Sequence, residues 1–234
     1  CSGGGHPAVR VRSARSRSSA STRWPQRQLN DPYVAEAKRH GYRSRAAFKL
    51  IELDQRFRLL GPGKRVLDLG AAPGGWTQVA AERVGSSGRV VGADILPMDP
   101  IAGAVTLQLD VTEEEAPARL REALGGPADL VLSDMAPAPT GHARTDQLRI
   151  VALAELAYAT AAELLAPGGA FVTKLFQGGA HAELMAALKR DFAQVRHAKP
   201  PASRKESAEI YLIATGFRGR ADPDEGRDGG RKEG

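Results

Sequence analysis

A short apolar strand that runs into a glycine-rich turn constrains the fold of this chain more than any other segment. Val66–Leu69 supplies the strand, and Gly70, Gly74 and Gly75 lie in the turn that starts a helix. Glycine suits such a turn because a side chain would keep the backbone away from a ligand, and because the turn visits dihedral angles that other residues resist. The segment therefore predicts a nucleotide-shaped pocket with free N–H groups at the helix start.

The spacing of these glycines narrows the ligand. It fits neither the G-x-G-x-x-G dinucleotide fingerprint nor the G-x-x-x-x-G-K-[ST] phosphate loop, and no Lys-Ser or Lys-Thr follows. A ligand with ribose and adenine but without phosphates is favoured, and S-adenosylmethionine is the commonest such cofactor. A plain strand-to-helix turn is the competing interpretation of this segment taken alone.

Apolar strands alternate with amphipathic helical stretches along the chain, which indicates an α/β fold with helices on both faces of a sheet. Helices are expected at 32–39, 44–58, from Thr112 with a capping box to Glu115, over 150–166 up to the Pro-Gly-Gly stop, and at 180–190. The predicted strands are 65–69, 89–93, 104–109, 130–133, 169–175, 194–197 and 210–215. The last two are joined by a loop too short for a helical crossover. This predicts a seven-stranded, mostly parallel sheet with one antiparallel strand.

We expect one folded domain over residues 30–217, between two disordered tails. Residues 1–29 are rich in arginine and serine and contain no acidic residue, and 218–234 mix charges with glycine. Three interpretations of the basic amino-terminal extension stay open: an RNA-binding arm, a cleaved targeting sequence or an inert tail. The protein is expected to be cytoplasmic, or mitochondrial if this extension is a transit peptide.

Composition excludes several classes of site. Cys1 is the only cysteine, which rules out internal disulfides, a cysteine metal cluster and a cysteine nucleophile within the fold, and no metal is expected. The chain has 33 Lys and Arg against 27 Asp and Glu, so its net charge of +6 favours a polyanionic partner without establishing one. The apolar stretch 150–166 carries Glu155 and Glu163, so a soluble protein is expected.

Polar residues at the carboxyl ends of the predicted strands are the candidate ligand contacts, because ligands lie at that edge of open α/β sheets. Asp94 follows Gly74 by 20 residues, where a carboxylate can bind both ribose hydroxyls. Asp110 could accept from the adenine amine or simply precede a helix. Trp76 could line the pocket or fill the core.

Two further charged residues end the next strands of the predicted sheet. Asp134 ends the fourth strand, where it would face both the cofactor and the acceptor atom. Lys174, among bulky apolar residues at the end of the fifth strand, is unusual unless its amine has a partner. A solvated lysine is the alternative interpretation.

Six separate motifs resemble the FtsJ (RrmJ) family of ribosomal RNA 2′-O-methyltransferases, over roughly residues 24–217. They are YRSRAAFKL (42–50), DLGAAPGGW (68–76), DILPM (94–98), SDMAP (133–137), VTKLFQG (172–178), and Lys199-Pro200 with Ser203-Arg204, Ser207, Glu209 and Tyr211. The chain departs from the family at Ala138, where members often have Asn, so we expect a contact in the substrate loop to differ.

The resemblance implies a Rossmann-like class I S-adenosylmethionine-dependent methyltransferase fold. It implies a catalytic tetrad of Lys49, Asp134, Lys174 and Glu209, and cofactor contacts at Gly74, Trp76, Asp94, Asp110 and Asp134. It also implies methylation of a uridine ribose in the A-loop of large-subunit ribosomal RNA, with the large ribosomal subunit as partner. A monomer is expected.

The chemistry implied is displacement at a methyl carbon by a ribose 2′-oxygen, whose proton a base must remove. Lys174 is the candidate base or oxyanion stabiliser, Lys49 the neighbouring cation that orients the hydroxyl, and the two carboxylates hold the lysines. Arg43, Arg45 and Arg204 are candidate phosphate contacts.

Competing functions differ in the residues that they require. A cytosine-C5 methyltransferase would need a cysteine nucleophile, which this chain lacks within its fold. An amino-nitrogen methyltransferase would need an aromatic residue after the fourth strand, where the motif SDMAP has none. A nicotinamide-dependent dehydrogenase, a methyltransferase of another RNA such as tRNA, and a non-catalytic ribosome-assembly factor stay open as alternatives.

Overall fold

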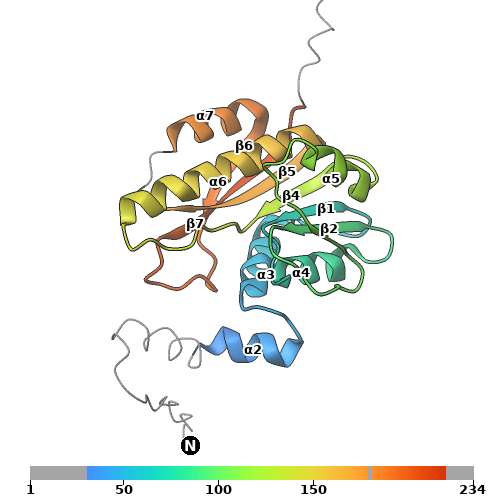
Figure 1. Cartoon of the computed structure of the whole chain (residues 1–234), viewed down its shortest axis with the longest axis horizontal. Helices are drawn as coiled ribbons and strands as arrows, with labels where there is room; N and C mark the ends of the chain where they lie inside the picture. Colours follow the sequence, from blue (N-terminus) through green and yellow to red (C-terminus); the bar gives the residue numbers. More distant parts are fainter. Residues whose placement is uncertain (1–30, 179–180, 220–234) are drawn as a thin grey trace, which may run out of the picture.

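The computed structural model describes residues 31–178 and 181–219, and they form a sheet with helices on both faces (Figure 1). The sheet has seven strands in the order β3-β2-β1-β4-β5-β7-β6. The strands are β1 (Arg65–Leu69), β2 (Arg89–Asp94), β3 (Val105–Gln108), β4 (Ala128–Ser133), β5 (Leu165–Phe176), β6 (Phe192–Ala198) and β7 (Glu209–Phe217). The helices are α2 (Pro32–His40), α3 (Ala46–Phe57), α4 (Gly75–Val84), α5 (Ala116–Leu124), α6 (Ala143–Leu164) and α7 (Ala182–Asp191).

Strand β7 is antiparallel to both of its neighbours, β5 and β6, and the other pairings are parallel. The short connection between β6 and β7 allows only this return, as the sequence indicated. The pairing places Lys174 of β5 opposite Tyr211 of β7, and Phe176 opposite Glu209. The predicted α/β class, strand count and single antiparallel strand are therefore confirmed.

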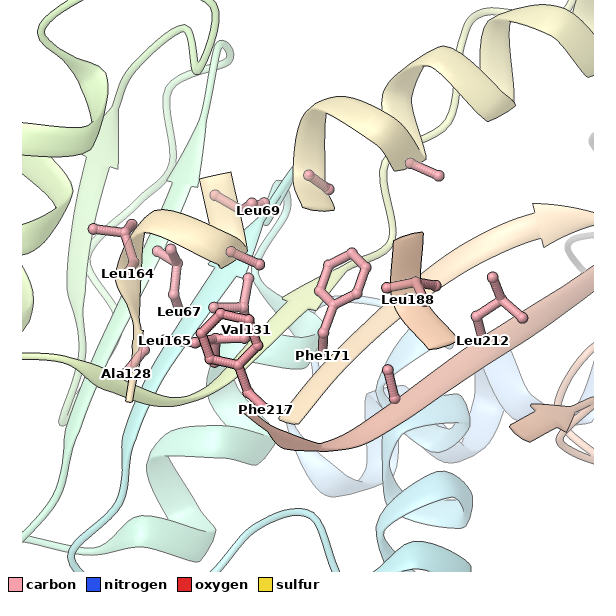
Figure 2. Packing of buried hydrophobic residues seen from close by; sticks show 14 of the residues in the cluster. Leu67, Leu69, Ala128, Val131, Leu164, Leu165, Phe171, Leu188, Leu212 and Phe217 are labelled. Atoms are coloured by element: carbon pink, nitrogen blue, oxygen red, sulfur yellow. The ribbon is translucent and has the colours of Figure 1, made fainter. Parts of the chain in front are cut away.

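The side chains of each strand alternate between two cores, one on each face of the sheet. In β1, Leu67 and Leu69 pack on the face covered by α5, α6 and α7, whereas Val66 packs on the face covered by α3 and α4. Figure 2 shows the first of these cores, where Leu67, Val131 and Phe171 come from adjacent strands. The parallel pairing among strands β1 to β5 carries their carboxyl ends to one edge of the sheet.

Two predictions about helix ends differ from the structure. The capping box from Thr112 is wrong: α5 begins at Ala116, and the Thr112 hydroxyl donates to Asp110 Oδ1 instead. Helix α6 ends at Leu164, two residues before the Ala166-Pro167-Gly168-Gly169 stop, because β5 already begins at Leu165. For α5 the physical reason is that the Asp110 carboxylate takes the Thr112 hydroxyl that the capping box would have used.

The predicted tails lie almost wholly outside the described residues. Residues 1–30 and 220–234 are not described, so the proposed roles of the basic extension stay predictions. Arg218, the first residue assigned to the second tail, donates to the carbonyls of Lys189 and Arg190 at the end of α7. Within residues 31–178 and 181–219, no helix has both the length and the apolarity to cross a membrane.

Asp68 of β1 is an acidic residue in the core beneath α4. Its side chain is 1% exposed; Oδ2 accepts from the Thr77 hydroxyl at 2.7 Å, whereas Oδ1 has no partner in the described structure. Burial raises the pKa of Asp68 to about 7, against the hydrogen bond from Thr77, and the nearby Asp134 and Asp94 add to the rise. The folded protein therefore holds a proton that the unfolded chain releases near pH 4.

This raised pKa predicts how stability changes with pH. Between about pH 4 and pH 7 the unfolded state ionises Asp68 while the folded state does not, so this residue makes folding less favourable as pH rises, and the effect levels off above pH 7. Asp68→Asn removes that dependence. We expect the free energy of unfolding of the variant, relative to wild type, to rise by about 4 kcal/mol from pH 4 to pH 8, measured by urea denaturation.

The exposed Asp99→Asn is the control, and its difference from wild type should stay constant over the same range. A constant difference for Asp68→Asn as well would mean that the Asp68 carboxyl is ionised in both states.

Candidate active site

The glycine-rich turn after β1 has the backbone geometry that its sequence predicts. Gly70 has φ +71° and Gly74, the residue before α4, has φ +110°. A Cβ on Gly70 would lie 2.3 Å from Met135 Cγ, and one on Gly74 would lie 2.5 Å from Ile101 Cδ1. Met135 leaves no room for a side chain on Gly70, and this close approach brings the turn against the loop that follows β4. At Gly74 only the end of a flexible side chain is in the way, and the positive φ is what favours glycine.

A cavity of about 470 Å³ opens at the carboxyl ends of β1, β2, β3 and β4. Asp94, Asp110 and Asp134 line it together with apolar residues that include Leu109 and Leu156. Among the described residues that line it, none is basic. A volume of this size suits a nucleoside-sized ligand. Three carboxylates without a cation oppose phosphate groups and favour a positively charged ligand.

Asp94 both faces the cavity and holds the turn. Its Oδ2 accepts from the Ala72 backbone N–H at 2.9 Å and its Oδ1 from the Leu96 N–H at 2.8 Å. A carboxylate has about four lone-pair positions, so both oxygens keep capacity for ribose hydroxyls. Asp94 is therefore a structural anchor as well as a candidate ligand contact.

Asp110 uses one oxygen locally and leaves the other for a ligand. Its Oδ1 accepts from the Thr112 N–H at 2.9 Å and from the Thr112 hydroxyl at 2.7 Å. These hydrogen bonds to the backbone and side chain of Thr112 lower the pKa of Asp110, which keeps the carboxyl ionised. The residue that precedes α5 thus turns the chain and lines the cavity at once.

Trp76 and Gly74, two of the predicted cofactor contacts, are not among the residues that line this cavity. The Trp76 side chain is buried, its indole N–H donates to the Ala46 carbonyl at 2.7 Å, and its ring lies 5.6 Å from the ring of Tyr211. Of the two roles considered from the sequence, the described contacts of Trp76 are those of a core residue. It fixes the start of α3, the helix that carries Lys49.

The four residues of the implied tetrad converge beside Asp134, although they come from α3, β7, β5 and the end of β4. Lys49 Nζ lies 2.7 Å from Glu209 Oε1, and Lys174 Nζ lies 3.0 Å from Asp134 Oδ1. Lys174 Nζ also donates to the Asp134 carbonyl at 2.7 Å. All four side chains are at most 18% exposed. Of the two interpretations of Lys174, the structure shows the lysine with a partner and not the solvated one, because its side chain is buried against Asp134.

Tyr211 links the two ion pairs. Its hydroxyl donates to Asp134 Oδ1 at 2.7 Å, and Lys49 Nζ lies 5.9 Å from the centre of its ring. Burial raises the pKa of Tyr211 well above its usual value, and the carboxylates of Asp134 and Glu209 add to the rise, so the phenol stays protonated and acts as a donor. Tyr211 lies two residues after Glu209 on one strand, so the strand period of two places both side chains on one face.

Asp134 stays ionised in spite of its burial. Burial by itself would raise the pKa of this carboxyl, but Lys174, then Lys49, and the Tyr211 hydroxyl together lower it below its ordinary value. The site therefore keeps a negative charge between the cavity and the two lysines. Asp134 is the residue that both lines the cavity and pairs with a lysine of the tetrad.

The loop between β6 and β7 completes the site from its far side. The Ser203 hydroxyl donates to Glu209 Oε1 at 2.6 Å, the same oxygen that Lys49 approaches. Arg45 donates to the Ala202 carbonyl at 2.7 Å and pairs with Asp31 at 2.9 Å. The sequence motif included Ser203 but did not indicate its role, because the bond depends on how the loop folds back.

The three arginines proposed as phosphate contacts all have partners within the protein. Arg43 donates to the carbonyls of Pro73, Asp99 and Pro100, and so ties the glycine-rich turn to the loop after β2. Arg45 and Arg204 share the carboxylate of Asp31. A role of these arginines in RNA binding stays a prediction.

Comparison with known proteins agrees with this geometry. The sequence profile of the FtsJ-like methyltransferase family matches residues 42–217. The chain is 62% identical over 219 residues to the Ribosomal RNA large subunit methyltransferase E of Paramagnetospirillum magneticum, covering 92% of this chain and 90% of that protein. It is 64% identical over 211 residues to the protein of the same name from Acidiphilium cryptum, covering 90% and 93%.

Solved structures agree on the fold. One from Plasmodium falciparum, described as a ribosomal RNA methyltransferase, superposes with a TM-score of 0.68 at 32% identity over 76% of this chain and 100% of that chain. A fibrillarin/Nop5p complex contains a chain that superposes with a TM-score of 0.51 at 20% identity, over 72% of this chain and 81% of that chain, which indicates a shared fold only.

The cavity predicts separate effects of its carboxylates on cofactor binding. We expect Asp94→Ala and Asp110→Ala each to weaken S-adenosylmethionine binding on the order of tenfold or more, because hydrogen bonds to charged acceptors are lost. Isothermal titration calorimetry measures the dissociation constants. Asp94→Ala should also lower the melting temperature, since it frees the Ala72 and Leu96 N–H groups.

Asp129→Ala, at the opposite end of β4, removes the same charge outside the cavity and should leave the affinity unchanged. Unchanged affinity in both cavity variants would place the cofactor elsewhere, and binding of NAD in preference would restore the dehydrogenase alternative.

Proposed function

The chain belongs to the FtsJ-like methyltransferase family, and from that membership we propose that it methylates a ribose 2′-hydroxyl of large-subunit ribosomal RNA. The relatives at 62% and 64% identity bear the name Ribosomal RNA large subunit methyltransferase E, and this chain covers at least 90% of each. One observation carries the proposal: two buried lysine–carboxylate pairs meet at Tyr211, beside a cavity that Asp134 also lines.

Membership of this family makes S-adenosylmethionine the cofactor, and the cavity fits it. Three carboxylates with no basic residue among the described lining suit a cationic nucleoside without phosphates. When bound, this cofactor supplies a methyl group made electrophilic by a positively charged sulfur. We assign Asp94 to the ribose hydroxyls, Asp110 to the adenine amine and Asp134 to the end nearest the acceptor, and Gly74 and Trp76 stay predicted contacts.

The tetrad would activate the sugar hydroxyl. A ribose hydroxyl is scarcely ionised at neutral pH, so its proton must leave as the new bond forms. We assign Lys174 Nζ to accept that proton as a neutral amine or, as an ammonium, to stabilise the oxygen anion. Lys49 orients the hydroxyl, Asp134 and Glu209 hold the two lysine side chains, and the Tyr211 and Ser203 hydroxyls fix the carboxylates.

The proposal extends to the target nucleotide, the partner and the oligomeric state. We propose a uridine in the A-loop as the target nucleotide, the assembling or assembled large subunit as partner, and a cytoplasmic monomer as the working form. A non-catalytic assembly factor would not need two buried lysines held in pairs at the cavity. A tRNA substrate is the remaining alternative within the same chemistry.

A direct assay tests the activity. We expect purified protein, given isotopically labelled S-adenosylmethionine and large subunits isolated from cells that lack the endogenous enzyme, to produce one labelled 2′-O-methyluridine. Mass spectrometry of the digested nucleosides identifies it. Label in tRNA instead, or in a base, would replace the proposed substrate or reaction, and binding without label would support the assembly-factor alternative.

Substitutions of Lys174 test its role. If Nζ accepts the proton, both Lys174→Ala and Lys174→Arg should lower kcat by about 10²-fold or more, because arginine keeps the charge but does not release a proton. Single-turnover kinetics measure the rates, and calorimetry checks that cofactor binding persists. Lys189→Ala, on the surface of α7, is the matched control.

Near-normal turnover of Lys174→Arg would leave Lys174 as an electrostatic stabiliser only. Near-normal turnover of Lys174→Ala would remove it from the chemistry altogether.

A further inference from the structure

A second cavity, of about 160 Å³, lies at the opposite end of α3 from Lys49. Its lining joins the end of that helix to strands β6 and β7. Three arginines surround it: Arg56 in the last turn of α3, Arg58 just after the helix, and Arg196 on β6, the strand at the edge of the sheet. Ile213 and Thr215 of β7 contribute to the lining, and none of the described lining residues is acidic.

Within the described residues the three guanidinium groups have no acidic partner, whereas five other arginines, Arg45 and Arg204 among them, do. Within residues 31–178 and 181–219, Arg56 lies over the ring of Phe57 at 5.0 Å and Arg196 donates to Gln194 at 2.9 Å, and neither pairs with a carboxylate. Arg58 has only its backbone N–H bonded, to the Asp54 carbonyl. By contrast, Arg45 and Arg204 share Asp31.

Local structure gives a reason for each arginine taken alone, but not for the position of all three around one cavity. A basic residue in the last turn favours the helix dipole, and charged residues protect an edge strand from pairing with other chains. Either purpose would be served by charges directed away from one another. Three like charges around one small cavity attract an anion more strongly than any one of them would alone.

The size of the cavity and the donors around it define the anion. A cavity of about 160 Å³ is smaller than the 300 Å³ or more that whole-ligand sites usually have, but it can hold one phosphate group. Guanidinium groups present forked donors that match phosphate oxygens. Along α3, Arg56 lies about 10 Å from Lys49, near enough for one RNA strand to reach both.

We propose that Arg56, Arg58 and Arg196 bind a backbone phosphate of the same ribosomal RNA whose ribose lies at the tetrad. This inference rests on the proposed function and adds a second anchor for its substrate. Contacts to phosphates position an RNA without reading its sequence. The arginines thus set the affinity for RNA, and they take no part in the methyl transfer.

The test compares two double variants of the full chain. Arg56→Gln/Arg196→Gln removes two charges at the cavity, and Arg83→Gln/Arg119→Gln removes two exposed charges outside it. Arg83 is a close match for Arg56, since it also lies in the last turn of a helix. Substrates are unmethylated large ribosomal subunits, and kcat and KM are measured at several salt concentrations.

For the cavity variant we expect KM for the subunit to rise on the order of tenfold at about 0.1 M salt, with kcat and the cofactor dissociation constant unchanged. The slope of log affinity against log salt should fall by about 1 to 2. The control variant should match wild type. All variants should melt at the wild-type temperature, because the substituted side chains are exposed.

An unchanged KM and salt slope in the cavity variant, or an equal change in both double variants, would overturn the proposal. A fall in kcat alone would also overturn it, because phosphate anchoring does not act on the chemical step. If wild type methylates no ribosomal RNA, the proposed function fails separately. Direct binding of a fluorescent transcript of the A-loop region still decides this inference, which fails if the cavity variant binds as tightly as wild type.

Discussion

Two buried ion pairs, Lys49–Glu209 and Lys174–Asp134, are the constraint on which the site depends. A buried charge without a partner is costly, so each lysine requires its carboxylate within hydrogen-bonding distance. The Tyr211 hydroxyl joins them by donating to Asp134. A shift of β7 against β5 would break the Lys49–Glu209 pair and the hydrogen bond from Tyr211 to Asp134 together, so the proposed chemistry depends on the antiparallel register.

The sheet topology brings these ion pairs next to the cavity of the candidate active site. Parallel strands carry Asp94, Asp110 and Asp134 to one edge, where they face the cavity, and the return of β7 carries Glu209 to the same edge. The packing of Trp76 against Tyr211 and its bond to Ala46 hold α3 over this edge. Core packing thus sets the position of Lys49, although Trp76 itself does not line the cavity.

Charge is segregated between the two cavities in a way that matches the proposed ligands. The cavity at the strand ends has three carboxylates, which suit a cationic cofactor, whereas the smaller cavity at the far end of α3 has three arginines, which suit a phosphate. Arg43, Arg45 and Arg204, nearer the tetrad, are bonded within the protein and secure the turn and loop around it. Binding and positioning are therefore divided among different arginines.

Local periodicity and the geometry of parallel sheets are enough to predict the seven strands, the antiparallel return and the carboxylates at the strand ends from the amino-acid sequence. Its family motifs also named the four residues that the structure joins in two buried ion pairs. Four contacts could be seen only in the folded chain: the bond from Tyr211 to Asp134, the bond from Ser203 to Glu209, the core packing of Trp76 and the bond from the Thr112 hydroxyl to Asp110. Each of these depends on which of several available partners a side chain meets, and that choice is made by segments distant in the chain or by competition between neighbours.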